Sequence, residues 1–73
     1  MSSDPVGVVV CGAAGRMGRM LVELAAETPG LRVAGAIEAP GHAHLGEDAG
    51  TLAGVRPLGV PLSADLSSVC RRL

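Results

Sequence analysis

The chain contains no phenylalanine, tyrosine or tryptophan, and its six basic residues are all arginine. With no aromatic ring to anchor it, a core has to be built from valine, leucine, isoleucine, alanine and methionine. The formal net charge is −1, and the sequence shows no basic face of the kind that binds nucleic acid. We therefore expect an aliphatic core and no nucleic-acid partner.

Cysteines are few, and there is neither a long hydrophobic run nor a basic N-terminal segment. Cys11 and Cys70 lie far apart and outside any CxxC pair, which favours reduced thiols in a cytoplasmic protein over a disulfide. No apolar run approaches the roughly 20 residues of a membrane span, and the start, MSSDPVG, is unlike a signal peptide. We expect a cytoplasmic protein without a membrane partner, with Cys11 an inert core thiol at the end of a buried strand.

The rest of the composition is that of a small globular domain. Of the 73 residues, 48% are apolar and 18% are charged, a balance typical of folded rather than disordered chains. A chain of this length forms at most one small domain. We expect a flexible polar tail over residues 1–5 and a folded region over residues 6–73.

Two changes of hydrophobic period define the first elements. Residues 6–11 (VGVVVC) predict a buried parallel strand, residues 15–28 predict a helix, and residues 31–37 (LRVAGAI) predict a second strand. This order predicts a βαβ unit with parallel strands and a right-handed crossover. One helical stripe carries the apolar residues that we expect to face the core: Met17, Met20, Leu21, Leu24, Ala25 and Thr28.

The second half of the chain is less regular. Residues 39–55 predict a loop, in which Glu47 and Asp48 are expected to be solvated. Residues 56–62 (RPLGVPL) predict a short third strand, weakened by two prolines. Residues 63–65 predict an N-cap before a last helix over residues 66–73. These elements are too few to cover both faces of a parallel sheet, so we expect the first part of a larger protein.

Three glycines mark the junction between the first strand and the helix. Gly12 permits a tight turn after the strand, Gly15 lets the backbone approach a phosphate, and Gly18 lets the helix pack closely on the strands. The helix N-terminus then offers free N–H donors and a positive dipole end to an anion. The pattern predicts an α/β fold of Rossmann type with a dinucleotide pyrophosphate at this turn.

An acidic residue completes the pattern. Glu38 closes the second strand, twenty residues after Gly18, where a carboxylate accepts hydrogen bonds from the adenosine ribose. A carboxylate there repels a 2′-phosphate, which favours NAD(H), whereas Arg16 could reach a 2′-phosphate and make NADP(H) possible. The alternative interpretation is a purely structural glycine turn, with Glu38 and Arg16 as solvated charges.

Three segments together resemble a known family. GAAGRMGR at 12–19, AIE at 36–38 and LGEDAG at 45–50 are similar to the N-terminal part of 4-hydroxy-tetrahydrodipicolinate reductase, also called dihydrodipicolinate reductase. The resemblance implies that the motif Gly12–Met17 holds the pyrophosphate and that Glu38 binds the adenine ribose. In this motif, the residues expected to bind the cofactor are Gly12, Ala13, Ala14, Gly15, Arg16 and Met17.

The same resemblance implies an activity for the complete enzyme. The family uses NADH or NADPH to reduce the cyclic product of dihydrodipicolinate synthase to tetrahydrodipicolinate, on the diaminopimelate route to lysine. Its members are typically cytoplasmic homotetramers. Ala39 stands where many members carry an arginine, which weakens the case for NADPH. The family's segments for proton donation, substrate binding and tetramerisation do not match this chain, which implies that the C-terminal substrate domain is absent. No catalytic residue is therefore assigned, and the chain alone is expected to be inactive.

Other interpretations remain open at this stage. Extended short-chain dehydrogenases and semialdehyde dehydrogenases have similar glycine turns, although LGEDAG at 45–50 counts against them. A regulatory domain that senses NAD(H), or an inactive truncated product, would share the same motif. His42 and His44 are spaced like half a metal site, but no third ligand stands at a suitable spacing. We therefore expect ordinary loop histidines and no metal.

Overall fold

The computed structural model describes residues 4–71. The predicted tail over 1–5 and the predicted helix over 66–73 therefore lie partly outside the described residues. The elements follow in the order β1 (Val6–Cys11), α1 (Arg16–Glu27), β2 (Leu31–Ile37), α2 (Ala49–Ala53), β3 (Leu62–Ser63) and α3 (Leu66–Arg71).

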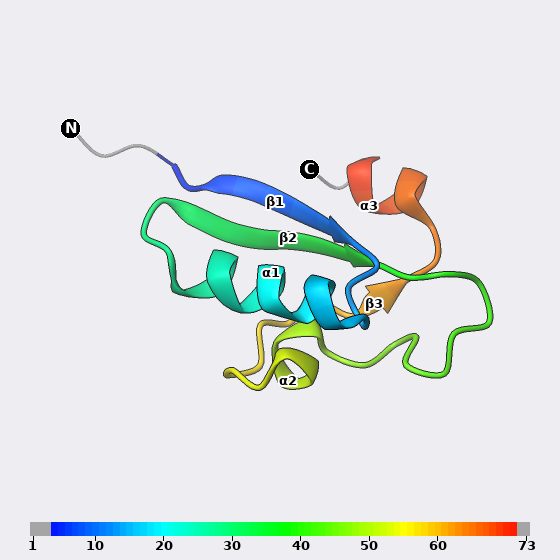
Figure 1. Ribbon diagram of the computed structural model, residues 1–73. Helices are drawn as coiled ribbons and strands as arrows, with labels where there is room; N and C mark the ends of the chain where they lie inside the picture. The colour runs from blue at the N-terminus through cyan, green and yellow to red at the C-terminus, as the bar shows by residue number, and fades with distance from the viewer. Residues whose placement is uncertain (1–3, 72–73) are drawn as a thin grey trace.

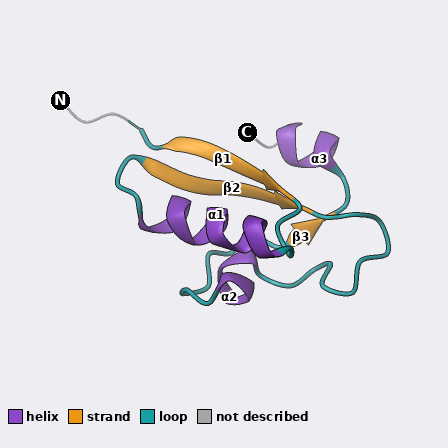
Figure 2. Ribbon diagram, in the orientation of Figure 1, coloured by secondary structure: helices purple, strands orange, loops and turns teal. Residues whose placement is uncertain are grey.

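The three strands form one parallel sheet in the order β1-β2-β3. Helix α1 connects β1 to β2 and, with α2, covers one face of the sheet, whereas α3 lies on the other face (Figure 1). The predicted βαβ unit and the α/β fold class are thus confirmed. Figure 2 shows how much of the second half of the chain is loop.

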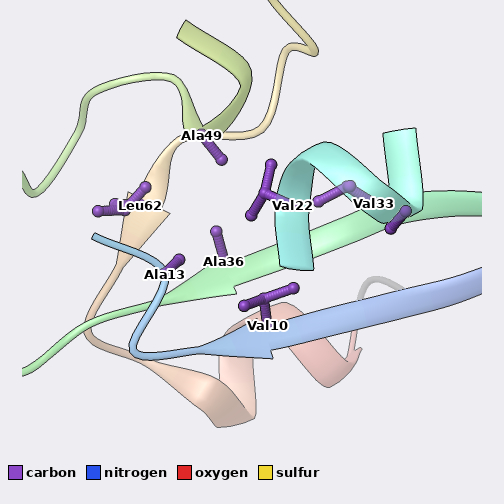
Figure 3. Close-up of a cluster of buried hydrophobic side chains, with 8 residues drawn as sticks. Val10, Ala13, Val22, Val33, Ala36, Ala49 and Leu62 are labelled. Carbon is purple, nitrogen blue, oxygen red and sulfur yellow. The ribbon is translucent and has the colours of Figure 1, made fainter. Parts of the chain in front are cut away.

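The core is small and aliphatic. Figure 3 shows side chains from β1, β2, β3, α1 and α2 meeting between the sheet and the helices. Val22 is the largest side chain that is fully buried. The pairing of β1 with β2 is irregular between Val8 and Val9, and this irregularity lets Val33 and Ala36, an odd number of residues apart, both join this core.

The prediction of the buried face of α1 is confirmed for Ala25, which is buried, but is wrong for the four large apolar residues of the predicted stripe. Met17, Met20, Leu21 and Leu24 are exposed, with 71% of the Met17 surface accessible. The helix instead packs on the sheet through a row of small residues, Gly18, Val22 and Ala25. Small side chains let the helix axis approach the strands closely, and this approach turns the larger apolar side chains away from the sheet.

The prediction that Cys11 is a core thiol is also wrong. Cys11 is exposed, as is Cys70, and both are free. Cys11 is the last residue of β1, and among the described strands β1 pairs with β2 alone. Alternate side chains of a strand point to opposite faces, so Cys11 lies on the other side of the strand from the buried Val10.

Residues 39–55 are not entirely loop, because α2 forms within them. The Asp48 side chain caps α2 by accepting a hydrogen bond from the Thr51 N–H at 2.9 Å, and Gly54 ends the helix in the left-handed region at φ 83°. Asp48 also accepts from the N–H groups of Leu58 and Val60, each at 3.0 Å. It therefore fastens the loop after α2 instead of being solvated.

The last two predicted elements are present but short. The third strand is reduced to Leu62–Ser63 because Pro57 and Pro61 interrupt the segment before it. Asp65 caps α3 as expected, with its Oδ1 accepting from the Ser68 N–H at 3.1 Å. None of the helices within residues 4–71 has the length and apolar character needed to cross a membrane.

Candidate functional site

The turn between β1 and α1 is tight and is fastened to β2. Gly12 has φ 73°, a conformation that favours glycine, which confirms its predicted role in the turn. The N–H groups of Gly12 and Ala13 both donate to the carbonyl of Ile37, at 2.8 and 3.1 Å. The end of β1 and the end of β2 are therefore held together at the start of the turn.

Gly18 has the packing role predicted for it. A Cβ added at this position would overlap the carbonyl oxygen of Gly12 and would lie 2.8 Å from the Cα of Ala13. The first turn of α1 can sit against the backbone of the glycine turn only because Gly18 has no side chain. The lack of a side chain at Gly18 therefore determines how closely the N-terminus of α1 lies to the turn.

Gly15 is different, because its backbone conformation does not require a glycine. It is the N-cap of α1 with φ −75°, which any residue adopts. A Cβ there would meet only the Gly12 carbonyl oxygen, at 3.3 Å. The bare backbone at Gly15 instead leaves the start of α1 open to a ligand. This is the requirement expected of a phosphate-binding glycine.

The first turn of α1 retains unpaired donors. Gly15 provides no side-chain cap, and within the described residues no acceptor receives the N–H groups of Arg16 and Met17. These groups lie at the positive end of the helix dipole, so they favour an anion. The N-terminus of α1 thus leaves two backbone donors available to a ligand.

Glu38 lies directly beside this turn. Its backbone N–H donates to the Ser63 carbonyl at 2.9 Å, which continues the pairing of β2 with β3. Its side chain reaches back across the end of the sheet, where Oε2 accepts from the Ala14 N–H and Oε1 accepts from the Ala39 N–H, each at 3.0 Å. The Glu38 side chain is therefore hydrogen-bonded to the glycine turn.

The surroundings of Glu38 favour its ionised form. The Ala39 and Ala14 N–H groups lower the pKa of the Glu38 carboxyl below its usual 4.5, partial desolvation opposes them, and His42 lowers it further. Each carboxylate oxygen has lone pairs left after accepting one N–H. An ionised acceptor with spare capacity can therefore take hydroxyl donors next to the glycine turn.

The other residues predicted to bind the cofactor are Ala13, Arg16 and Met17, and each lies in a different environment. Ala13 is buried in the core, with only 2% of its surface exposed. The Arg16 side chain is exposed and lines a shallow depression with Glu23 and Leu52, between α1 and α2. Met17 has an unpaired backbone N–H in the first turn of α1, and its side chain is exposed.

A pair of histidines follows Glu38, and the residue pattern predicted only that they lie in a loop. The His42 and His44 rings lie 5.5 Å apart, and His44 Nδ1 lies 2.8 Å from Glu47 Oε2. Between residues 4 and 71, no three histidine, cysteine or acidic side chains gather closely enough to hold a metal ion.

A parallel βαβ unit with a glycine turn, an open helix N-terminus and an acid at the end of β2 defines a Rossmann-like, nucleotide-binding type of segment. The family model described as "Dihydrodipicolinate reductase, N-terminus" matches residues 6–72. The chain belongs to this family.

Similar full-length proteins bear the same name. The chain is 64% identical over 59 residues to the 4-hydroxy-tetrahydrodipicolinate reductase of Rhodopseudomonas palustris (strain BisB18), covering 81% of this chain and 22% of that protein. It is 58% identical over 62 residues to that of Anaeromyxobacter sp. (strain Fw109-5), covering 85% and 22%. The matched region thus spans about a fifth of the length of these relatives.

Proposed function

We propose that this chain binds the adenosine diphosphate half of a pyridine dinucleotide, as the N-terminal part of a 4-hydroxy-tetrahydrodipicolinate reductase. The observation that carries the proposal is the hydrogen bond between the Ala14 N–H and Glu38 Oε2. This bond holds the Glu38 carboxylate next to the N-terminus of α1, and an acid beside a phosphate-binding turn is the arrangement a dinucleotide requires, which supports ribose binding by Glu38.

The residues present fit such a cofactor. The unpaired N–H groups of Arg16 and Met17 would hold the pyrophosphate, and the bare backbone at Gly15 would let it approach. Glu38 would accept hydrogen bonds from the ribose hydroxyls. Since its carboxyl is held ionised and would repel a 2′-phosphate, the site favours NAD(H), with NADP(H) as a possible second cofactor.

We assign the reaction to the complete enzyme. There the bound nicotinamide would supply a hydride to the dihydrodipicolinate-type substrate, and together with one proton this would give tetrahydrodipicolinate, a step toward diaminopimelate and lysine. The residues of this chain would bind and orient the cofactor, and the catalytic residues would come from other segments. A homotetramer in the cytoplasm is part of the same proposal.

A titration tests cofactor binding directly. We expect NADH added to the ¹⁵N-labelled chain to shift the amide resonances of Ala14 to Met17 and of Ala39, with little change in α3. Gly15→Val should abolish these shifts, because its side chain would stand where the phosphates approach. Met20→Val, at an exposed position further along α1, is the matched control and should bind as the unaltered chain does.

Two results would count against this function. Unaltered NADH affinity in Gly15→Val would remove the pyrophosphate assignment. If the coding sequence after residue 73 specified a transporter or transcription-factor domain, a regulatory domain that senses NAD(H) would replace the reductase.

A further inference from the structure

The backbone of Glu38 is held by a very short strand. Strand β3 contains only Leu62 and Ser63 and pairs with the end of β2, and the Ser63 carbonyl accepts the Glu38 N–H at 2.9 Å. A pairing of two residues is too short to fix a strand by itself. The position of Glu38 therefore depends on what holds β3 from its other side.

The other neighbour of β3 is the segment that leads into α2. Leu62 donates its N–H to the Glu47 carbonyl, and the Leu62 carbonyl accepts the Gly46 N–H, each at 2.9 Å. Further along, the Ala49 N–H donates to the Val60 carbonyl at 2.8 Å. The side chains of Ala49 and Leu62 are both buried in the core (Figure 3). Strand β3 is thus held between β2 and this segment.

The Asp48 side chain fastens this segment to the residues that lead into β3. Its Oδ1 accepts the Val60 N–H and its Oδ2 accepts the Leu58 N–H, each at 3.0 Å. The two carboxylate oxygens therefore determine how the chain enters β3. Hydrogen bonds joined by short stretches of backbone connect Asp48, through β3, to Glu38 and then to the Ala14 N–H.

We propose that Asp48 is a positioning residue for the cofactor: by holding β3 in place, it determines where the Glu38 carboxylate meets the ribose. This inference rests on the proposed function and extends its site to a side chain outside the glycine turn. The first turn of α1 is placed by the glycine turn and the end of β2. The effect of Asp48 should therefore fall on the ribose more than on the pyrophosphate.

A double-mutant cycle separates this role from a general loss of stability. We expect Asp48→Asn, which keeps the shape of the side chain but replaces one acceptor oxygen, to weaken NADH binding about fivefold and NADPH binding less. Glu38→Gln is expected to affect the two cofactors in the same order, so Asp48→Asn should add little to it in the double variant. Affinities are measured by NMR titration of the 73-residue chain and corrected for the folded fraction found by urea denaturation.

Asp65→Asn is the matched control. Asp65 caps α3 through the Ser68 N–H, so this change should leave both affinities unaltered. A second measurement needs no variant: NADH should slow hydrogen exchange at the Leu58 and Val60 N–H groups, which Asp48 accepts, and should not slow it at the Ser68 N–H. This measurement decides the matter if Asp48→Asn does not fold.

The outcomes separate the two claims. If the unaltered chain binds neither cofactor, the proposed function fails and this inference fails with it. If it binds NADH but Asp48→Asn weakens both cofactors equally, or adds its full effect to Glu38→Gln, only the positioning role of Asp48 is overturned. Unchanged NADH affinity in Asp48→Asn, or exchange at the Val60 N–H that NADH does not slow, would also overturn that role.

Discussion

At the scale of single residues, Glu38 connects two parts of the site that the sequence shows only as separate motifs. Its two carboxylate oxygens accept N–H groups from Ala14 and Ala39. The spacing from the glycines predicted that this acid would lie near the turn, because strand and helix lengths in a βαβ unit are restricted. The direct hydrogen bond to Ala14 was not predictable, since it depends on the side-chain rotamer and on the conformation of the turn.

Glu38→Gln should weaken NADH binding about tenfold and NADPH binding less, because only the 2′-hydroxyl of NADH relies on an anionic acceptor. Glu27→Gln, at an exposed position on α1, is the control and should change neither affinity. Equal losses for both cofactors, measured by the same titration, would contradict the ribose assignment.

The pH dependence of NADH binding provides a second test of the role of Glu38. Because its pKa in the folded chain lies below 4.5, the contribution of the carboxylate is complete above about pH 4.5 and is lost as the pH falls through the lowered value. We therefore expect NADH binding by the unaltered chain to persist at pH 4.5.

At the scale of elements, the sequence predicted the connection from β1 through α1 to β2 well and the orientation of α1 poorly. Short apolar runs and glycine positions are local properties, so they can be read from the chain. Which face of a helix is buried depends on what packs against it. Here the close approach at Gly18 buries Val22, outside the predicted stripe, and leaves Met20, within that stripe, exposed.

The buried face of α1 can be checked by paired substitutions. Val22→Ala should lower the free energy of unfolding by about 2 kcal/mol, since Val22 is fully buried. Met20→Ala should change it by less than about 0.5 kcal/mol, since Met20 is 64% exposed. Urea denaturation followed by far-UV circular dichroism measures both. If Met20→Ala were more destabilising than Val22→Ala, the face of α1 predicted from the sequence would be the buried one.

Helix α2 escaped prediction because it is only five residues long. Its cap, from Asp48 to Thr51, is local, but the same Asp48 side chain is also held by contacts ten and twelve residues along the chain, which the sequence does not show. Burial raises the pKa of Asp48, but the N–H groups of Leu58, Thr51 and Val60 and the Thr51 hydroxyl outweigh it and hold the pKa at about 2. The depressed pKa means that the stabilisation by Asp48 is complete above its usual value of 3.8 and is lost as the pH falls toward 2.

Asp48→Ala should therefore destabilise the chain by about 2 kcal/mol at pH 7, through loss of the cap and of two loop contacts. It should also flatten the dependence of unfolding free energy on pH between about 4 and 2. Asp65→Ala, which removes the cap of α3 alone, is the comparison and should cost less. If the unfolding free energy of Asp48→Ala still fell by the same amount between about pH 4 and pH 2, other groups would be responsible for that loss.

At the scale of the whole molecule, the described residues form a thin body of 43 × 27 × 18 Å. Its core consists of valine and alanine with a single leucine. One side of α1 presents a continuous apolar surface that also reaches β1, where Leu21 and Leu24 line a depression with Val8 and Val10. So much exposed apolar surface over so small a core leaves little net stabilisation.

We accordingly expect the isolated chain to be marginally stable, with a thermal midpoint below the roughly 45 °C at which mesophile domains begin to cluster. Saturating NADH should raise that midpoint, because a ligand that binds only the folded state stabilises it. Differential scanning calorimetry with and without the nucleotide measures both. A cooperative transition far above 45 °C without NADH would contradict this expectation.

The hydrogen bond from Ala14 to Glu38 has a consequence for anyone who wishes to redesign cofactor choice. Exchanging the acid for a basic side chain would alter ribose recognition and would also remove one of the hydrogen bonds that hold the glycine turn, so affinity for either cofactor would fall. Engineering toward a phosphorylated ribose is better begun one position later, at Ala39, where an arginine adds charge and leaves that hydrogen bond in place.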